Sequence, residues 1–164
     1  MIPVVRSASL DEWERFREIR LRALAGAPDA YGSTLDAEIA NPEADWRAWV
    51  QGWQGAANRV SVAEADGAWV GIAVGSRTGQ EPDAHLYAMW VDPAWRRRGI
   101  GAELVAAVVA WARSWGARSV VLGVTLGNDA ERVYQALGFE DAGERHRLRE
   151  GSELPIAILR LQLV

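Results

Sequence analysis

The sequence predicts an α/β domain with a mixed sheet and helices on both of its faces. The first observation is the order of strand-like and helix-like segments along the chain, which reads β-α-α-β-β-β-α-β-α-β-β. The second is the run RSVVLGV at 118–124, which is almost continuously apolar, as in a strand covered on both faces. The third is the length of 164 residues with 49% hydrophobic residues, which favours a single domain over residues 1–164.

The N-terminal part predicts a short strand followed by a helix. The apolar run IPVVR at 2–6 indicates the strand. Ser9 and Glu12 have the spacing of a capping box, which begins a helix, and Gly26 and Pro28 end it.

Tryptophans at helical spacing mark the second helix. Trp46, Trp49 and Trp53 fall on one side of this segment. The stripe is either part of the core or one wall of an acceptor pocket. After it, two apolar runs flank Asp66-Gly67, a pair that suits a two-residue hairpin turn with positive φ.

The segment WRRRGIGAEL at 95–104 has the chemistry of a phosphate cradle at the start of a helix. Unpaired backbone N–H groups at a helix N-terminus attract anions, and glycines let a phosphate approach them closely. The segment lacks the Gly-Lys-Ser/Thr of a P-loop, and Leu104 stands where a dinucleotide fingerprint has its third glycine. A solvated basic turn is the alternative interpretation.

Two longer segments around this turn resemble the GNAT superfamily of acetyl-CoA-dependent N-acetyltransferases. VDPAWRRRGIGAELV carries its Arg/Gln-x-x-Gly-x-Gly/Ala signature at Arg96, Gly99 and Gly101. VTLGNDAERVYQALGF carries the second half of the pattern, at Asn128, Ala130, Tyr134, Gly138 and Phe139. The resemblance covers about residues 86–139, and YGST at 31–34 looks like many small bacterial members.

The resemblance implies a GNAT-type mixed, mostly antiparallel sheet with a splayed central strand pair, HLYAMWV and VVLGV. It implies acetyl-CoA as cosubstrate, with its pantetheine arm in the gap between these strands and its pyrophosphate on the N–H groups of residues 97–102. No metal is expected. The implied cofactor-binding residues are Met89, Val91, Arg96, Arg97, Arg98, Gly99, Ile100, Gly101, Ala102 and Asn128.

For the chemistry, the resemblance implies Tyr134 as the acid that protonates the leaving thiolate, and a backbone N–H near Met89 or Trp90 as the oxyanion donor. Tyr134 could instead be a core residue, and Asn128 only a helix cap. The chain has no cysteine, so we expect direct attack by the amine in a ternary complex.

The sequence leaves open which group acts as the general base that deprotonates the amine. Some relatives carry a glutamate where this chain has Gly123, and others carry one where it has His85. His85 is the candidate because an imidazole titrates near neutral pH. A surface histidine and a water relay are alternatives. Further candidates are Glu38, Glu64, Glu81 and Asp83.

The sequence therefore predicts an N-acetyltransferase acting on a small-molecule or peptide amine acceptor. The alternative is a non-catalytic acyl-CoA-binding or sensing domain. The net charge of −4 disfavours a nucleic-acid-binding module that uses Arg96–Arg98. Without a signal peptide or an apolar run of membrane-spanning length, we expect a cytoplasmic protein with no membrane partner, and a homodimer is possible.

Overall fold

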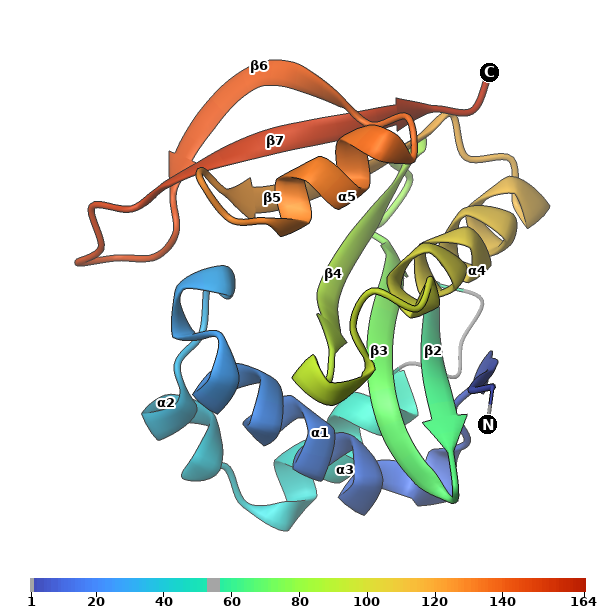
Figure 1. Ribbon diagram of the computed structural model, residues 1–164, viewed down its shortest axis with the longest axis vertical. Coiled ribbons are helices and arrows are strands. Elements are labelled where there is room, and N and C mark those ends of the chain that lie inside the picture. The colour runs from blue at the N-terminus through green and yellow to red at the C-terminus, as the bar shows by residue number, and fades with distance from the viewer. Residues whose placement is uncertain (1, 53–56) are drawn as a thin grey trace.

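A seven-stranded sheet forms the centre of the computed structural model, which describes residues 2–52 and 57–164 (Figure 1). The strand order is β1-β2-β3-β4-β5-β7-β6, and every neighbouring pair is antiparallel except β4 and β5, which are parallel. The strands are β1 (Val4–Ser7), β2 (Asn58–Ala65), β3 (Ala68–Arg77), β4 (Asp83–Val91), β5 (Ser119–Thr125), β6 (Glu140–Arg147) and β7 (Pro155–Gln162).

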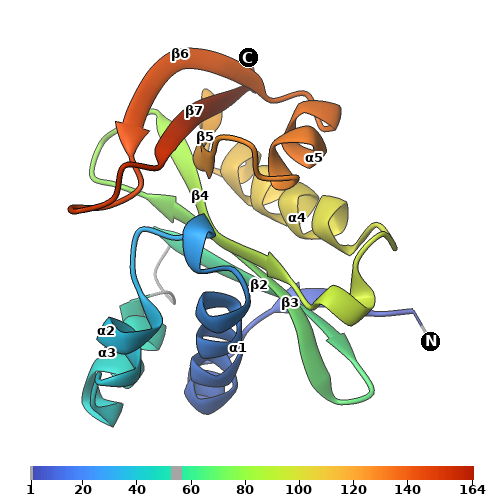
Figure 2. The same ribbon diagram turned by 60° about the vertical axis from the view of Figure 1, so that its left-hand side comes forward.

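Helices cover both faces of this sheet, as Figure 2 shows. The apolar sides of α4 and α5 pack on one face, whereas α1 and α3 pack on the other, so two separate cores form. The predicted mixed, mostly antiparallel sheet with helices on both faces is confirmed. The helices are α1 (Trp13–Gly26), α2 (Leu35–Ile39), α3 (Glu43–Gly52), α4 (Ile100–Ser114) and α5 (Ala130–Ala136), with single 3-10 turns η1 (Leu10–Glu12), η2 (Pro28–Ala30) and η3 (Pro93–Trp95).

Local sequence signals decide several boundaries. The Ser9 N–H donates to the Glu12 carboxylate at 2.9 Å, so the predicted capping box begins the helical segment, as η1 that continues into α1. Asp66 and Gly67 have φ values of 51° and 76°, which confirms the predicted hairpin turn between β2 and β3. The short helix α2 has no counterpart among the expected elements.

The tryptophan stripe of α3 is mainly core. Trp46 is only 1% exposed and packs against Phe16 and Trp49 with ring centroids 5.9 Å and 5.3 Å away. Trp49 is 41% exposed at the edge of this cluster. The third member of the predicted stripe, Trp53, lies outside the described residues.

The parallel pair β4–β5 is splayed, as predicted. It is paired only where Asp83–His85 face Ser119–Val121, and beyond this point the strands separate. Side-chain hydrogen bonds join the strands at the paired end. The Asp83 carboxylate of β4 accepts from Ser119 Oγ of β5 at 2.6 Å and from Arg160 Nη1 of β7 at 2.9 Å. Partial burial acts to raise the pKa of Asp83, but these two donors outweigh it and lower that pKa.

Candidate active site

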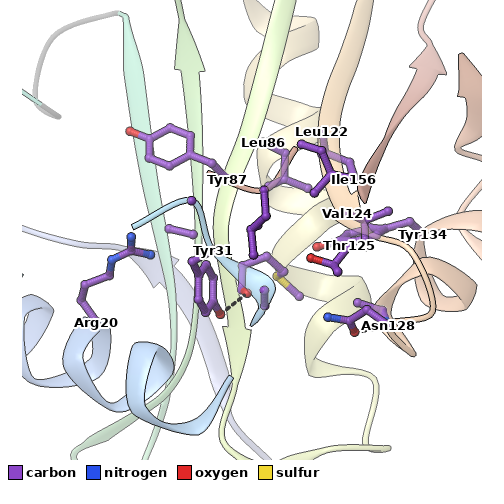
Figure 3. Close-up of a pocket in the computed structure, with 17 residues that line it drawn as sticks. Arg20, Tyr31, Leu86, Tyr87, Leu122, Val124, Thr125, Asn128, Tyr134 and Ile156 are labelled. Atoms are coloured by element: carbon purple, nitrogen blue, oxygen red, sulfur yellow. Dashed lines mark hydrogen bonds between the residues drawn. The ribbon is translucent and has the colours of Figure 1, made fainter. Parts of the chain in front are cut away.

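A pocket of about 300 Å³ lies where β4 and β5 separate (Figure 3). Its walls come from both strands, from α1 and the η2 loop on one side, and from α5 on the other. The lining residues are Arg20, Ala30, Tyr31, Gly32, Leu86, Tyr87, Ala88, Met89, Leu122, Gly123, Val124, Thr125, Asn128, Ala130, Tyr134, Leu148 and Ile156.

A bulge interrupts β4 at the pocket. Ala88 and Met89 stand together opposite Ala73 of β3, and Ala88 has a φ of 54°. A left-handed alanine is a strained conformation that persists only where the surrounding structure enforces it. The bulge lies beyond the last paired residues of β4 and β5, where the two strands have separated.

The turn before α4 has the geometry of an anion site. Gly99 is its N-cap with a φ of 81°, and the first helical hydrogen bond runs from the Glu103 N–H to the Gly99 carbonyl. The N–H groups of residues 100–102 therefore lack a helical partner. A Cβ atom on Gly101 would lie 3.1 Å from Met89 Cε, so the turn lies directly against the side chains of β4.

The three arginines of this turn differ in their contacts. All of them are exposed. The Arg96 Nε–H donates to the Val91 carbonyl at 2.9 Å, and the Arg98 guanidinium stacks on the Trp95 ring, 4.8 Å from its centroid. Arg97 has a φ of 62° and no hydrogen-bond partner within the described chain. Of the three arginines, Arg97 is therefore the one that could bind a phosphate without breaking a contact within the protein.

Tyr134 of α5 closes the other side of the pocket. Its side chain is 7% exposed, and its ring packs edge-on against Phe139 at a centroid distance of 5.8 Å. Burial raises the pKa of the Tyr134 hydroxyl above its ordinary value, so the group stays protonated at neutral pH. Asn128 also lines the pocket, and its Oδ1 accepts the Ala130 N–H at 2.9 Å, so its side chain caps the start of α5 although the N-cap residue itself is Asp129.

Tyr31 fixes the loop on the opposite face of the sheet. Its hydroxyl donates to the Met89 carbonyl at 2.9 Å, within the β4 bulge (Figure 3). Arg149, at the start of the β6–β7 loop, donates to the Tyr31 carbonyl at 2.9 Å. Three segments that are distant in sequence are thus held together at this wall.

The profile of the Acetyltransferase (GNAT) family matches residues 13–139. The chain belongs to this family. Solved GNAT structures have the same fold over almost the whole chain. An acetyltransferase from Streptococcus pneumoniae superposes with a TM-score of 0.84 at 17% identity, covering 98% of this chain and 99% of that one. YncA from Salmonella typhimurium, a putative acetyltransferase solved with acetyl-CoA, gives 0.82 at 22% identity, with 100% and 95% coverage.

Curated GNAT relatives match over a shorter stretch. The aminoglycoside N(6')-acetyltransferase type 1 of Salmonella typhimurium is 33% identical over 88 residues, which are 49% of this chain and 61% of that protein. The N-alpha-acetyltransferase RimI of Mycobacterium tuberculosis is 36% identical over 88 residues, with 52% and 54% coverage. The chain thus spans less than two thirds of the length of these relatives, whose names describe different acceptors.

Three of the predicted site residues of this GNAT chain line one pocket, and the turn before α4 approaches one of them. Met89, Asn128 and Tyr134 line it, and the turn 96–102 lies beside Met89. His85 is not among the described lining residues. It lies at the paired end of β4, where its Nε2 is 3.2 Å from the Glu81 carboxylate.

The other carboxylates considered as a base for this GNAT chain also lie off the pocket. Glu64 pairs with Arg6 and Arg15, Asp83 belongs to the paired end of the strands, and Glu81 is exposed beside His85. Glu38 is 3% exposed and paired with Arg20. Among the described residues there is no cluster of side chains that could hold a metal ion, and no helix is long and apolar enough to cross a membrane.

The sequence analysis missed Arg20 and Leu148 as pocket residues. Arg20 lies in the middle of α1, where it is one of several arginines, and nothing in its local pattern distinguishes it. Leu148 is the first residue of the β6–β7 loop. Their places depend on tertiary contacts, of Arg20 with Glu38 and Tyr31 and of Leu148 with the segment at Gly32. Tyr31 carried a weak signal, since YGST is similar to a segment of small bacterial relatives.

Proposed function

We propose that this protein is an acetyl-CoA-dependent N-acetyltransferase that transfers acetyl directly to an amine. The observation that carries the proposal is the opening between β4 and β5. It joins a pocket containing Tyr134 to a helix N-terminus with unpaired N–H groups and exposed arginines. Family membership supports the same activity.

In this proposal acetyl-CoA enters from the α4–α5 face. The N–H groups of residues 100–102 and the Arg97 guanidinium bind the pyrophosphate, because both are donors that face an anion without rearrangement. The backbone of β4 from Met89 to Val91 pairs with the pantetheine arm, and Asn128 contacts it from α5. Arg96 and Arg98 extend the positive field around the turn.

The acyl transfer needs two proton movements. The neutral amine nitrogen attacks the thioester carbonyl carbon, the C–S bond then breaks, and the thiolate sulfur takes a proton. We assign that proton to the Tyr134 hydroxyl, whose raised pKa keeps it available. A backbone N–H at the β4 bulge stabilises the oxyanion.

The amine must lose a proton before or during attack. His85 stays a prediction for this role, but its position outside the described pocket wall favours transfer to solvent water instead. A pH–rate profile separates the two routes, as argued below.

The experiment that tests the proposed function is thiol release from acetyl-CoA with an amine library, with mass spectrometry of the products. We expect at least one acetylated amine, formed together with an equal amount of free CoA. Gly101→Val is the matched control, because it should remove cosubstrate binding and with it all products. Binding of acetyl-CoA without transfer to any amine would instead indicate an acyl-CoA-sensing domain.

A further inference from the structure

The acceptor side of the pocket holds one charged side chain among the described lining residues, Arg20 of α1. Its guanidinium is fixed from two directions. The Glu38 carboxylate of α2 accepts from Nε and from Nη2, both at 2.9 Å, and the Tyr31 ring lies 5.0 Å from the guanidinium carbon. Glu38 is 3% exposed and Arg20 is 13% exposed, so the pair is shielded from water.

This arrangement uses only one of the two edges with which a guanidinium binds carboxylates. Glu38 takes the edge formed by Nε and Nη2. The second edge is formed by Nη1 and the other hydrogen of Nη2, and Nη1 has no hydrogen-bond partner in the described part of the chain. That edge can donate two parallel hydrogen bonds to a second carboxylate.

The rest of the pocket limits what the second carboxylate can belong to. Figure 3 shows Arg20 and Tyr134 at opposite sides of the pocket, with β4 between them. The described lining contains no aspartate or glutamate, so a second ammonium group would find no carboxylate partner there. Leu122, Leu148 and Ile156 supply an apolar wall instead.

We propose that the acceptor is a neutral amino acid, whose carboxylate binds Arg20 and whose aliphatic or aromatic side chain lies on the apolar wall. The inference rests on the proposed function and adds the acceptor class to it. Arg20 is then a specificity-determining residue, and Glu38 is a positioning residue that holds the guanidinium. Polycationic amines and peptide N-termini are the acceptors that it disfavours.

The test compares leucine with isoamylamine, the same amine without its carboxylate, in steady-state acetylation. The variant is R20Q/E38Q, which removes the guanidinium without leaving an unpaired carboxylate in a buried site. We expect its kcat/KM to fall at least about tenfold for leucine and less than about threefold for isoamylamine, because only leucine loses charge-assisted hydrogen bonds. Arg17→Gln, an exposed arginine of the same helix, is the matched control and should change neither value.

A purely structural role for the Arg20–Glu38 pair would lower both kcat/KM values equally or unfold the protein, and either result overturns the proposal. Arg20→Lys provides the second measurement, since it keeps the charge and loses the two-pronged geometry. It should lower the leucine to isoamylamine ratio while keeping the fold.

The failure of this inference is distinguishable from failure of the proposed function. If isoamylamine, spermidine or a leucyl peptide is acetylated better than any of leucine, methionine and phenylalanine, the acceptor class is wrong and the acetyltransferase stands. If calorimetry shows no acetyl-CoA binding and no amine is acetylated, both are wrong.

Discussion

Gly101 lies where the backbone of α4 comes closest to the splayed strand. A Cβ atom there would meet Met89 Cε at 3.1 Å and Val91 Cγ2 at 3.9 Å. Both contacts are ends of side chains, so Gly101→Val can fold, but its methyl groups cover the N–H groups that we assign to the pyrophosphate. We expect calorimetry to show at least about a hundredfold loss of acetyl-CoA affinity.

The control for this prediction is Gly52→Val at the end of α3, where a Cβ meets no atom of the described residues within 4 Å. It should bind acetyl-CoA like the parent protein. Unchanged affinity in Gly101→Val would remove the phosphate site from the start of α4.

The hydroxyl of Tyr134 can be removed with little change in packing. Tyr134→Phe keeps the ring in its edge-on contact with Phe139. General acid catalysis contributes about 10²–10⁴-fold, so kcat should fall at least about tenfold while the Kd for acetyl-CoA stays within about twofold. Stopped-flow thiol release and calorimetry give the two quantities. An equal loss of binding and turnover would mark Tyr134 as a packing residue.

His85 presents a test of how the amine loses its proton. If water carries the proton, kcat/KM rises with pH toward the pKa of the amine, about 10.4 for an alkylamine. We expect His85→Ala to keep this profile, because the side chain contacts Glu81 and not the pocket. Loss in the variant of a limb near pH 6.5, where imidazoles titrate, would establish His85 as the base after all.

At the scale of elements, Glu12 joins the start of α1 to the sheet. Its carboxylate accepts from Arg6 at 2.8 and 2.7 Å, from Arg15 at 3.0 Å and from the Ser9 N–H at 2.9 Å. The hydrogen bonds from Arg6 contribute most to lowering the pKa of Glu12 from 4.5 to about 2. Because the folded pKa is depressed, the stabilisation is present above pH 4.5 and is lost as the pH falls toward 2.

Glu12→Gln should therefore flatten the acid limb of stability. Urea unfolding of the parent protein should lose of order 2 kcal/mol more than the variant between pH 4.5 and 2. Glu14→Gln, an exposed glutamate in the first turn of α1, should follow the parent curve. If the free energy of unfolding changes with pH equally in the parent and in Glu12→Gln, the protonation of Glu12 is not coupled to folding.

The elements that the sequence predicts are those with local causes. The capping box at Ser9 and the Asp66-Gly67 turn act over a few residues, and both were predictable. The splay of β4 from β5 was expected only through family resemblance, and the bulge at Ala88 has no local signal, because an alanine gives no local reason for a positive φ. The Arg20–Glu38 pair was not predictable, since it depends on how α2 packs on α1.

At the scale of the whole molecule, the splayed sheet separates two binding tasks. α4 and α5 lie on one face of the sheet and α1 lies on the other (Figure 2). In our proposal the first face presents the turn 96–102 and Asn128 to acetyl-CoA, whereas α1 and the η2 loop present Arg20 and Tyr31 to the acceptor. In our proposal the two substrates meet between the strands without competing for one surface. They can then react in a ternary complex, as we expect for a chain that has no cysteine to carry an acyl group.

Acetyl-CoA should stabilise the whole fold, because in our proposal it bridges β4, α4 and α5 across the opening. A ligand at 100 times its Kd contributes about 2.7 kcal/mol, which for a domain of this size raises Tm by about 5–10 °C. Differential scanning fluorimetry should show this shift in the parent protein, in Tyr134→Phe and in R20Q/E38Q, because neither variant touches the pyrophosphate site. Gly101→Val should lose it while keeping the Tm of the unliganded protein within a few degrees. A full shift in Gly101→Val together with its loss in R20Q/E38Q would place acetyl-CoA on the acceptor face and reverse the assignment of the two sides.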